Sequence, residues 1–354
     1  MLVLTGGFLG SGKTTAILNA CKYLVNRNMK VAVITNDQGT QQVDHAFIQA
    51  MGLMVKQVGN GCFCCQYNEL ESHLQYLENN EQPDFIFAES VGSCTDLVAT
   101  IVKPLFTRKP DLKVMVSVFA DASFLNALME GRKLFKDESI RYLYKKQLEE
   151  ADRLVINKTD LVTAAQLTMI DQVIKKDYPD KIVLHQNSLK DVSAWITNIE
   201  AFKMSDTRHS LQIDYNLYGD AESKLAWLDK SMIIKAPLGN GAFIARTLIS
   251  SIFSEIHGRG FSIGHLKFFL AGKDWSEKIS FTASSTNGDV KIRHENVFQL
   301  RVMINARVLI EPDRLKQLIA EVIDALRDTN MCSFINEQEE VFKPGYPKPM
   351  YRIL

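Results

Sequence analysis

Three cysteines fall within four residues of one glycine-rich loop. The loop reads GNGCFCC and contains Cys62, Cys64 and Cys65, half of the six cysteines in a chain of 354 residues. Thiolates bind soft and borderline divalent metals, and Zn²⁺ usually takes four ligands. Adjacent thiols can also carry out redox chemistry by forming a disulfide. We favour a metal site of three thiolates, because its open coordination position suits metal transfer.

The sequence does not determine which group occupies that open position. Water, a ligand from a partner protein, or a side chain that the fold brings close are the alternatives. The candidate side chains are Asp37, Asp44, His45, His73 and Cys94. Cys94, in ESVGSC, is interpreted as a small packing residue in preference to a ligand. The isolated cysteines Cys21 and Cys332 are interpreted in the same way.

A phosphate-binding loop stands near the start of the chain. Residues 7–14, GFLGSGKT, fit the pattern G-x-x-x-x-G-K-[ST] between an apolar strand and a helix. The glycines let main-chain N–H groups surround phosphate oxygens, and the helix adds its positive N-terminal end. Lys13 would neutralise the β- and γ-phosphates, and the Thr14 hydroxyl would bind Mg²⁺. The nucleotide-binding residues predicted here are Gly7, Gly10, Ser11, Gly12, Lys13, Thr14 and Thr15.

A second motif, Asn157-Lys158-Thr159-Asp160, follows the apolar strand RLVI and indicates guanine. The Asp160 carboxylate would accept hydrogen bonds from the ring N–H and the exocyclic amine of guanine. Adenine lacks this pair of donors and would leave a buried carboxylate unpaired. Lys158 would lie along the base. Asn157, Lys158 and Asp160 are therefore predicted to select GTP over ATP.

Two carboxylates are expected beside the phosphates. Glu89 ends the apolar strand DFIFAE, where a carboxylate would hold the Mg²⁺ shell or orient a water molecule. Gly92 would present its N–H to the γ-phosphate. Asp37 follows the strand KVAVIT and is expected to reach Mg²⁺ within a switch segment at 36–44, although it could also be a turn residue. The predicted catalytic residues are Lys13, Glu89 and Asp37, and the predicted Mg²⁺ residues are Thr14 and Asp37.

The elements that position these loops alternate between strand and helix over residues 1–205. Short apolar runs, typical of strands buried on both faces, include LVLT, KVAVIT, MVKQV, DFIFAE, KVMVSVFA, RLVIN and KIVLHQ. Helical segments separate these runs. The pattern predicts an α/β domain with a doubly wound, mostly parallel sheet. The cysteine loop would then lie between a strand at 54–58 and a helix that begins near Asn68.

Residues 206–230 form the predicted linker, and residues 231–354 form a smaller second domain. Strands are predicted over SMIIKA, HLKFFLAG, KISFTAS and VFQLRVMINARV. Of these, HLKFFLAG and KISFTAS are expected to pair. Helices are expected over NGAFIARTLISSIFSEIHG and over PDRLKQLIAEVIDALRD, which opens with proline. The order predicts an α+β fold of ferredoxin-like type with an optional extra strand. The Pro-rich tail VFKPGYPKPMYRIL is expected to be irregular.

The charge of the chain is balanced, with 41 Lys and Arg against 41 Asp and Glu. No global basic field therefore points to nucleic acid or to an anionic membrane. No apolar run approaches the roughly 18 residues of a membrane span. The first residues lack the pattern of a signal peptide, so we expect a cytoplasmic location. In a reducing compartment, clustered cysteines favour metal or redox chemistry over structural disulfides.

The chain resembles the CobW-type GTPase metallochaperones, which are relatives of the nickel-insertion GTPases UreG and HypB. The resemblance lies in the order and spacing of four motifs, GGFLGSGKTT, GCFCC, ESVG and NKTD. The three-cysteine motif is the signature of that family. The resemblance implies a P-loop GTPase that couples GTP binding and hydrolysis to loading or release of a metal. The implied cofactors are GTP or GDP, Mg²⁺, and Zn²⁺ or Co²⁺. The residues carried over are Lys13 and Thr14 for phosphate and Mg²⁺, Glu89 for hydrolysis, Asn157, Lys158 and Asp160 for guanine, and Cys62, Cys64 and Cys65 for the transferred metal.

Two features depart from the family pattern. The family commonly has Asn-Glu-Phe-Gly after the second strand, whereas this chain has Asn36-Asp37-Gln38-Gly39. The shorter side chain of Asp37 changes its reach toward a metal. Many members also carry a histidine-rich linker, but the seven histidines here are scattered. A metal-storage role is therefore not expected.

Two functions are predicted as alternatives. In the first, the chain is a GTPase metallochaperone whose nucleotide state controls the transfer of a divalent metal, zinc or cobalt, to a client metalloprotein. In the second, it is a GTPase that regulates or reactivates a partner, such as a cobalamin-dependent enzyme, and the cysteine loop is a redox or passive site. Either client would bind the C-terminal domain, and the family resemblance suggests a nucleotide-dependent homodimer. NKTD disfavours an ATPase or a P-loop kinase, and the neutral charge disfavours nucleic acid.

Overall fold

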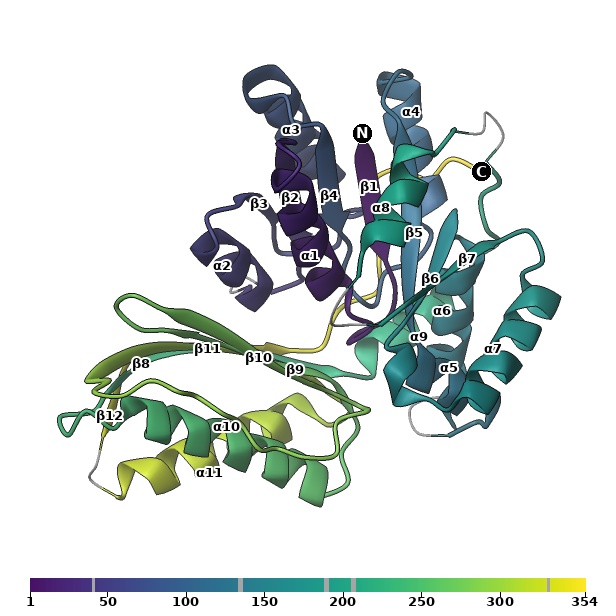
Figure 1. Cartoon of the computed structure of the whole chain (residues 1–354). Helices are drawn as coiled ribbons and strands as arrows, with labels where there is room; N and C mark the ends of the chain where they lie inside the picture. The colour runs from purple at the N-terminus through teal and green to yellow at the C-terminus, as the bar shows by residue number, and fades with distance from the viewer. Residues whose placement is uncertain (40–41, 133–135, 188–190, 205–207, 330–331) are drawn as a thin grey trace. The chain divides into compact units, whose positions relative to one another are not determined.

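The computed structural model describes residues 1–39, 42–132, 136–187, 191–204, 208–329 and 332–354. These residues form two compact units, whose elements are labelled in Figure 1. Unit 1 comprises Met1–Gln38, Gly52–Ala221 and Tyr346–Leu354, and unit 2 comprises Gly39–Met51 and Glu222–Gly345. None of the helices in the described ranges has the length and apolar character that a bilayer span requires.

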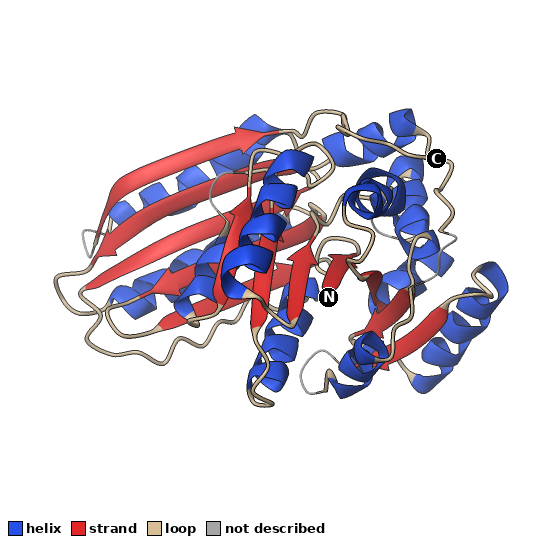
Figure 2. Ribbon diagram, turned by 90° about the horizontal axis from the view of Figure 1, so that it is seen from above, coloured by secondary structure: helices blue, strands red, loops and turns tan. Residues whose placement is uncertain are grey.

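Unit 1 is built on a seven-stranded sheet in which all neighbouring strands run parallel. In sheet order the strands are β3 (Met54–Val58), β2 (Val31–Asn36), β4 (Phe85–Glu89), β1 (Leu2–Gly6), β5 (Val114–Asp121), β6 (Arg153–Asn157) and β7 (Ile182–Gln186). β1, β2, β4 and β5 are buried along their whole length, because helices cover both faces of the sheet (Figure 2). The predicted doubly wound parallel sheet is confirmed.

The helices of unit 1 connect these strands. They are α1 (Lys13–Val25), α3 (Tyr67–Tyr76), α4 (Lys103–Arg108), α5 (Ala122–Met129), α6 (Glu138–Glu149), α7 (Ala164–Asp177) and α8 (Ser193–Glu200), with α9 (Tyr215–Ser223) at the boundary of the unit. Side chains define several of the starts. The Asp121 carboxylate caps α5 by accepting from the N–H of Ser123 and Phe124, and Thr163 and Gln166 form a capping box on α7.

The carboxyl ends of the parallel strands meet along one edge of the sheet. The register there places Thr5, Thr35 and Glu89 side by side on β1, β2 and β4. On the other side of β1, Asp121 pairs with Asn157. In parallel sheets this edge is where ligands bind. The phosphate loop, the cysteine loop and the loop after Glu89 all leave from it.

Unit 2 contains a five-stranded sheet with the order β10-β9-β11-β8-β12, in which all neighbours are antiparallel. Its strands are β8 (Ala226–Lys235), β9 (Ile263–Ala271), β10 (Ser276–Thr282), β11 (Gln299–Val308) and β12 (Ser333–Phe342). Helices α10 (Gly241–Gly258) and α11 (Pro312–Arg327) lie side by side against one face (Figure 1). Without β10, the order and connections are ferredoxin-like, as predicted. The strand that completes this order, β12, lies at residues where the sequence pattern predicted none.

The two faces of this sheet carry different partners. The buried residues of α11 have i, i+3, i+4, i+7 and i+8 spacing, and they are Leu315, Leu318, Ile319, Val322 and Ile323. Phe268 and Ile304 pack in the same core. Their sequence neighbours Phe269 and Met303 point to the opposite face, because side chains alternate along a strand. There they pack against Val43 of α2 (Val43–Ala50).

A buried polar network joins the segment before α2 to the sheet of unit 2. Arg307 Nη1 donates to Asp229 Oδ1 at 2.6 Å, and both side chains are fully buried. Asn305 donates to the same oxygen at 2.7 Å and accepts from the Val43 N–H at 2.8 Å. A Cβ on Gly39 would lie 1.6 Å from Asp229 Oδ2, so only glycine fits there. Segment 39–51 is therefore an integral part of unit 2.

These units differ from the predicted domain boundaries in three places. Residues 39–51 belong to unit 2, and residues 346–354 belong to unit 1. The predicted linker at 206–230 contains α9 and the start of β8. Positions 40 and 41 of the predicted switch segment, and 205–207 at the predicted linker, lie outside the described residues. Both reassignments depend on packing that hydrophobic periodicity does not report.

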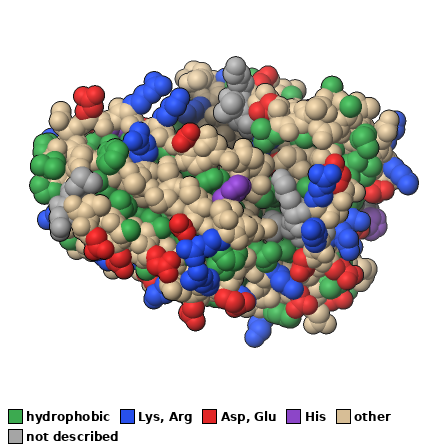
Figure 3. Space-filling view, turned by 90° about the horizontal axis from the view of Figure 1, so that it is seen from below, with side chains coloured by type: hydrophobic (Ala, Val, Ile, Leu, Met, Phe, Trp, Pro, Cys, Tyr) green, Lys and Arg blue, Asp and Glu red, His purple; other side chains and the backbone are tan. Residues whose placement is uncertain are grey.

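The surface carries charges of both signs. On the face shown in Figure 3, Lys and Arg side chains are interspersed with Asp and Glu side chains. This distribution agrees with the equal numbers of basic and acidic residues in the sequence.

We predict that Arg307→Met lowers the free energy of unfolding of unit 2 by about 3–5 kcal/mol, because it leaves the buried Asp229 carboxylate without its cation. Urea denaturation of the full chain, followed by tryptophan fluorescence, measures this change. Trp227 lies beside the substituted residue, since the guanidinium carbon of Arg307 is 4.1 Å from the centre of the Trp227 ring. Arg314→Met on the exposed side of α11 is the control and should change stability by less than about 0.5 kcal/mol. Equal midpoints for the two variants would contradict the prediction.

Candidate functional site: a phosphate loop beside a cysteine cluster

Three glycines of the phosphate loop, Gly7, Gly10 and Gly12, have positive φ. Gly7 has φ of 123°, and a Cβ there would lie 2.1 Å from the carbonyl oxygen of Phe119. Gly12 has φ of 95°, and a Cβ there would lie 2.3 Å from Asn157 Nδ2. Side chains are therefore excluded both by conformation and by close packing. These two contacts hold the loop against β5 and β6.

Lys13 and Thr14 begin α1, immediately after this loop. Lys13 is 6% exposed, and its Nζ donates to the carbonyl oxygens of Gly7 at 2.6 Å and Phe8 at 3.3 Å. The ammonium group is thus already inside the loop. Thr14 Oγ1 donates to Glu89 Oε1 at 2.8 Å. The structure therefore brings the predicted Mg²⁺ hydroxyl into contact with the predicted hydrolysis carboxylate.

The guanine motif contacts the phosphate loop from the other side. Asn157 Nδ2 donates to the carbonyl oxygen of Ser11 at 2.9 Å, and Lys158 Nζ donates to that of Gly10 at 2.7 Å. Lys158 also forms a 2.7 Å ion pair with Asp121, which is fully buried. Asp160 is exposed on a 3₁₀ turn, where a base could reach its carboxylate. Asn157 and Lys158 thus brace the phosphate loop, and Asp160 is left facing solvent.

Asp121 is a residue of the site that lies outside the sequence motifs. It occupies the last position of β5 and caps α5 with one carboxylate oxygen, while the other oxygen accepts from Lys158. The sequence signal was an aspartate between an apolar strand and a helical pattern. That signal predicts a cap, but it does not show that the same carboxylate positions Lys158.

Gly92 and Asp37 lie at the same edge of the sheet. A Cβ on Gly92 would lie 2.7 Å from the Leu9 side chain and 2.9 Å from the Leu9 nitrogen, so this loop contacts the phosphate loop. Asp37 directly follows β2, is partly exposed, and donates its N–H to the Val58 carbonyl at 3.3 Å. The roles of Gly92 at the γ-phosphate and of Asp37 at Mg²⁺ remain predictions.

Asn36 connects the end of β2 to the cysteine loop. Its Nδ2 donates to the carbonyl oxygens of Val58 at 3.1 Å and Gly61 at 2.7 Å. Its Oδ1 accepts from the Phe63 N–H at 2.9 Å. One side chain therefore bonds the main chain on both sides of Cys62. The sequence does not predict this role of Asn36, and its only local signal is an asparagine next to Asp37.

The three cysteines form a compact cluster whose sulfurs all lie within 4.8 Å of one another. Cys62 Sγ is 2.8 Å from that of Cys64 and 3.2 Å from that of Cys65, and the last two are 3.9 Å apart. Hydrogen bonds from Cys64 and Cys65 hold the pKa of Cys62 well below its usual value. The side-chain hydrogen bond with Cys62 raises the pKa of Cys64 well above its usual value and that of Cys65 to about 11. The three sulfurs are therefore hydrogen-bonded to one another within the cluster.

The candidates for a further ligand differ in their surroundings. Asp44 lies in the first turn of α2, whose N-cap is Gln42. Burial alone would raise the pKa of Asp44, but its ion pairs with Lys267, at 2.5 Å, and with Lys278 hold it well below the usual range. His73 Nε2 bonds the Gln57 carbonyl at 2.9 Å. Cys94 instead shares a side-chain hydrogen bond with Cys62.

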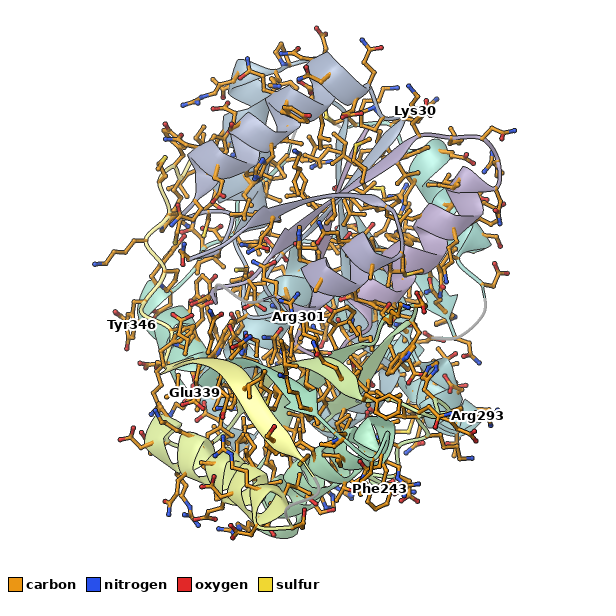
Figure 4. All side chains as sticks on the ribbon, turned by 90° about the vertical axis from the view of Figure 1, so that its left-hand side faces the viewer. Lys30, Phe243, Arg293, Arg301, Glu339 and Tyr346 are labelled. Atoms are coloured by element: carbon orange, nitrogen blue, oxygen red, sulfur yellow. The ribbon has the colours of Figure 1, made fainter. Side chains whose placement is uncertain are left out.

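The C-terminal tail runs over the cysteine loop. The Met350 N–H donates to the Cys64 carbonyl at 2.9 Å, and the Lys348 N–H donates to Cys65 Sγ at 3.4 Å. Arg352 bonds Asp96 at 2.7 Å and anchors the tail further along. The tail starts at Tyr346, which is labelled in Figure 4. Residues 343–354 are irregular, as predicted, whereas Val341 and Phe342 of the predicted tail belong to β12. The position of the tail against the cysteines is a finding of the structure.

The fold and this edge of the sheet define a P-loop GTPase-type domain with a cysteine cluster next to the nucleotide loop. The family profile for the nucleotide-binding domain of CobW/HypB/UreG matches residues 1–185. The chain therefore belongs to the CobW/HypB/UreG family, and the resemblance predicted from the motifs is confirmed.

Several relatives are similar to this chain. The zinc chaperone YeiR of Escherichia coli is 26% identical over 185 residues, which are 51% of this chain and 53% of that protein. The zinc-regulated GTPase metalloprotein activator 1 of Dictyostelium discoideum is 28% identical over 219 residues, or 51% of this chain and 44% of that protein. The crystal structure of Zn(II)-bound YjiA GTPase from E. coli covers 91% of this chain and 98% of that one, at 14% identity and a TM-score of 0.41. The chain spans about half the length of the curated relatives it matches.

We predict that Arg352→Ala loosens the tail, because it removes a charged hydrogen bond to the buried Asp96. Since Arg352 is partly exposed, the loss should be about 1 kcal/mol, or roughly a fivefold loss of protection of the tail amides. Hydrogen–deuterium exchange of the peptide that contains Met350 measures this protection. Lys348→Ala is the control, because Lys348 contacts Cys65 through its main-chain N–H. Unchanged exchange in Arg352→Ala would show that the tail is held elsewhere.

Proposed function

We propose that this protein binds and hydrolyses GTP and couples its nucleotide state to the binding and transfer of a divalent metal, zinc or cobalt, to a client protein. The observation that carries the proposal is the pair of bonds from Asn36 to Gly61 and Phe63 on either side of Cys62. Asn36 directly precedes Asp37, the proposed Mg²⁺ residue. Any change in the main chain at 36–37 on nucleotide binding would therefore be passed to the cysteine loop.

The nucleotide half of the proposal rests on this chain's own residues. Lys13 would neutralise the β- and γ-phosphates, and its ammonium group already lies within the loop at 2.6 Å from the Gly7 carbonyl. Thr14 and Asp37 would hold Mg²⁺, which would neutralise charge on the phosphates. Glu89, 2.8 Å from Thr14, would orient the water that attacks the γ-phosphate. Asp160 would read the guanine base, with Lys158 held alongside by Asp121.

The metal is proposed as a cargo of the cysteine loop. Sulfurs around a tetrahedral Zn²⁺ ion lie roughly 3.8 Å apart, given a Zn–S distance of about 2.3 Å. The observed separations of 2.8, 3.2 and 3.9 Å approach that arrangement. Asn36 positions the main chain of the loop, and the tail N–H of Lys348 donates to the Cys65 sulfur. The names of the relatives, zinc chaperones and a zinc-regulated metalloprotein activator, support zinc as the first metal to test.

The client-binding role is assigned to unit 2. Leu238, Phe243 and Phe298 are large apolar side chains that are 76%, 49% and 58% exposed. The Val297 N–H donates to the Gly239 carbonyl at 2.8 Å, and the Gly241 N–H donates to the Val297 carbonyl at 2.9 Å, which brings their segments together. An exposed apolar group of this kind is typical of a contact surface. Phe243 is labelled in Figure 4. A client metalloprotein or a cobalamin-related enzyme is the proposed occupant, and a second copy of the chain in a nucleotide-dependent homodimer is the alternative.

We predict that zinc affinity differs by about tenfold or more between the GDP·Mg²⁺ state and the state with a non-hydrolysable GTP analogue, which is about 1.4 kcal/mol of coupling. Competition titration of the reduced protein with a zinc indicator measures both affinities. Asn36→Ala should bring the two affinities closer together. Asn80→Ala, an exposed asparagine that also bonds a carbonyl oxygen, is the control.

Two results would contradict the proposal. Equal zinc affinities in both nucleotide states of the wild type would remove the coupling. Absence of zinc binding, together with two oxidised cysteines in anaerobically purified protein, would instead favour a partner-regulating GTPase with a redox loop.

We predict that Asp160→Asn weakens guanine nucleotide binding by roughly 10²- to 10⁴-fold, because its amide would present a donor to the donor edge of guanine. Xanthine carries an oxygen where guanine carries the amine. The variant should therefore bind xanthosine diphosphate better than the wild type does. Fluorescent nucleotide titration with both bases measures the exchange of preference. Asp180→Asn, an exposed acid in the same unit, should bind like the wild type. Retained guanine preference in Asp160→Asn would exclude this residue as the base reader.

A further inference from the structure

Four buried or partly buried cysteines converge at one place in unit 1. Cys62, Cys64 and Cys65 form the cluster already described, and Cys94 comes from the loop that follows Glu89. Cys94 is 2% exposed, and its side chain is hydrogen-bonded to that of Cys62. The sequence interpretation of Cys94 as a packing residue does not account for this contact.

The geometry points to Cys94 as the fourth thiolate of the metal site, closing a tetrahedral four-sulfur shell around Zn²⁺ or Co²⁺. This inference rests on the proposed metal-binding function and names the ligand that the three-cysteine motif lacks. Thiolate donors in a tetrahedral arrangement suit these ions. Cys62 and Cys64 are only 2% and 4% exposed, so the protein covers this side of the site where a water ligand would otherwise enter.

The loop that carries Cys94 is held in place from α6. Gln147 Nε2 donates to the carbonyl oxygens of Cys94 at 2.8 Å and Gly92 at 3.1 Å. Glu150 accepts from the Leu97 N–H at 2.6 Å and from the Thr95 hydroxyl at 3.1 Å. These bonds fix the main chain on both sides of the sulfur. Cys94 is therefore presented by a preorganised loop, as a ligand should be.

The cysteine loop is the part that must adjust. Cys94 is not among the sulfurs that all lie within 4.8 Å of one another, so metal binding must draw the loop sulfurs and Cys94 together. Gly61, with φ of 150°, precedes Cys62 and gives the loop conformations that other residues rarely adopt. A metal ion bound by all four sulfurs would thus tie the cysteine loop to the loop that follows Glu89.

This fourth ligand would also connect the metal to the nucleotide loop. Cys94 lies two residues beyond Gly92, whose backbone packs against Leu9 of the phosphate loop. It lies five residues beyond Glu89, which bonds Thr14. The Asn36 bonds act on the other three ligands.

The first test counts the sulfur ligands without any substitution. X-ray absorption at the zinc edge of the full-length, zinc-loaded protein should show four sulfurs at about 2.3 Å. Three sulfurs and one oxygen or nitrogen at about 2.0–2.1 Å would overturn the inference. Because this measurement uses the wild-type chain, it does not depend on whether a variant folds.

The second test compares cysteine variants by Co²⁺ titration, in which the thiolate charge-transfer band reports each sulfur bound. Cys94→Ser should lose about a quarter of the charge-transfer band. Its metal affinity should fall by more than roughly 10- to 100-fold, which is the loss expected when a residue that only hydrogen-bonds a ligand is removed. Cys332→Ser, a partly exposed cysteine of unit 2, should match the wild type. Thermal unfolding of the metal-free variants checks that each is folded.

The outcomes separate this inference from the proposed function. If the wild type binds neither Zn²⁺ nor Co²⁺, or if the triple Cys62/Cys64/Cys65→Ser variant binds as the wild type does, the proposed metal function fails. If the triple variant loses binding while folded Cys94→Ser retains the full band and affinity, only the fourth-ligand inference fails. Loss of one sulfur in Cys94→Ser, with binding abolished in the triple variant, supports both.

Discussion

Parallel pairing of β1, β2, β3 and β4 is the constraint on which the site depends, because it aligns the loops that follow these strands. The register places Thr5, Thr35 and Glu89 at the same level. Thr14 therefore meets Glu89, although the two residues are 75 positions apart. Asn36, opposite Val58 in the next strand pair, reaches the cysteine loop for the same reason. A slip of one residue would turn Glu89 to the other face of the sheet and break this arrangement.

Buried polar groups hold the loops in place once the strands are aligned. Such groups are costly in a low-dielectric interior unless each finds a partner, so they permit few alternative arrangements. The ion pair between Asp121 and Lys158 holds the Asn157–Asp160 motif against Gly10 of the phosphate loop. On the other flank, Glu150 fixes the loop beyond Cys94 through two hydrogen bonds. Burial raises the pKa of Glu150 to about 8, because the protein interior disfavours the charged form of its carboxyl group.

The segment after Asp37 gives the chain a covalent route from the nucleotide edge into unit 2. Residues up to Gln38 belong to unit 1, and residues from Gly39 belong to unit 2. In unit 2, α2 is fastened by the Asp44 ion pairs, by the Asn305 bond to Val43, and by the close approach of Gly39 to Asp229. The chain therefore passes from the sheet edge that carries Asn36 and Asp37 to a helix that packs on the second sheet.

The sequence by itself determined the features that are local. Glycine spacing predicted the phosphate loop, and apolar runs predicted both folds. The guanine role of NKTD and the metal role of the three cysteines stay predictions. Each of these signals lies within a short segment, since conformational freedom, ligand chemistry and hydrophobic period are properties of neighbouring residues. The family assignment followed from the order of the same segments.

Tertiary structure decided which distant segments meet. Nothing near Cys94, Asn36 or Asp121 in the sequence indicates that they reach the cysteine loop or Lys158. The same holds for the tail, which is irregular in itself but bonds Cys64 and Cys65. Segment 39–51 likewise joins unit 2 through contacts with β9 and β11. These placements depend on strand order, register and side-chain packing between segments more than 20 residues apart, and only the folded chain contains that information.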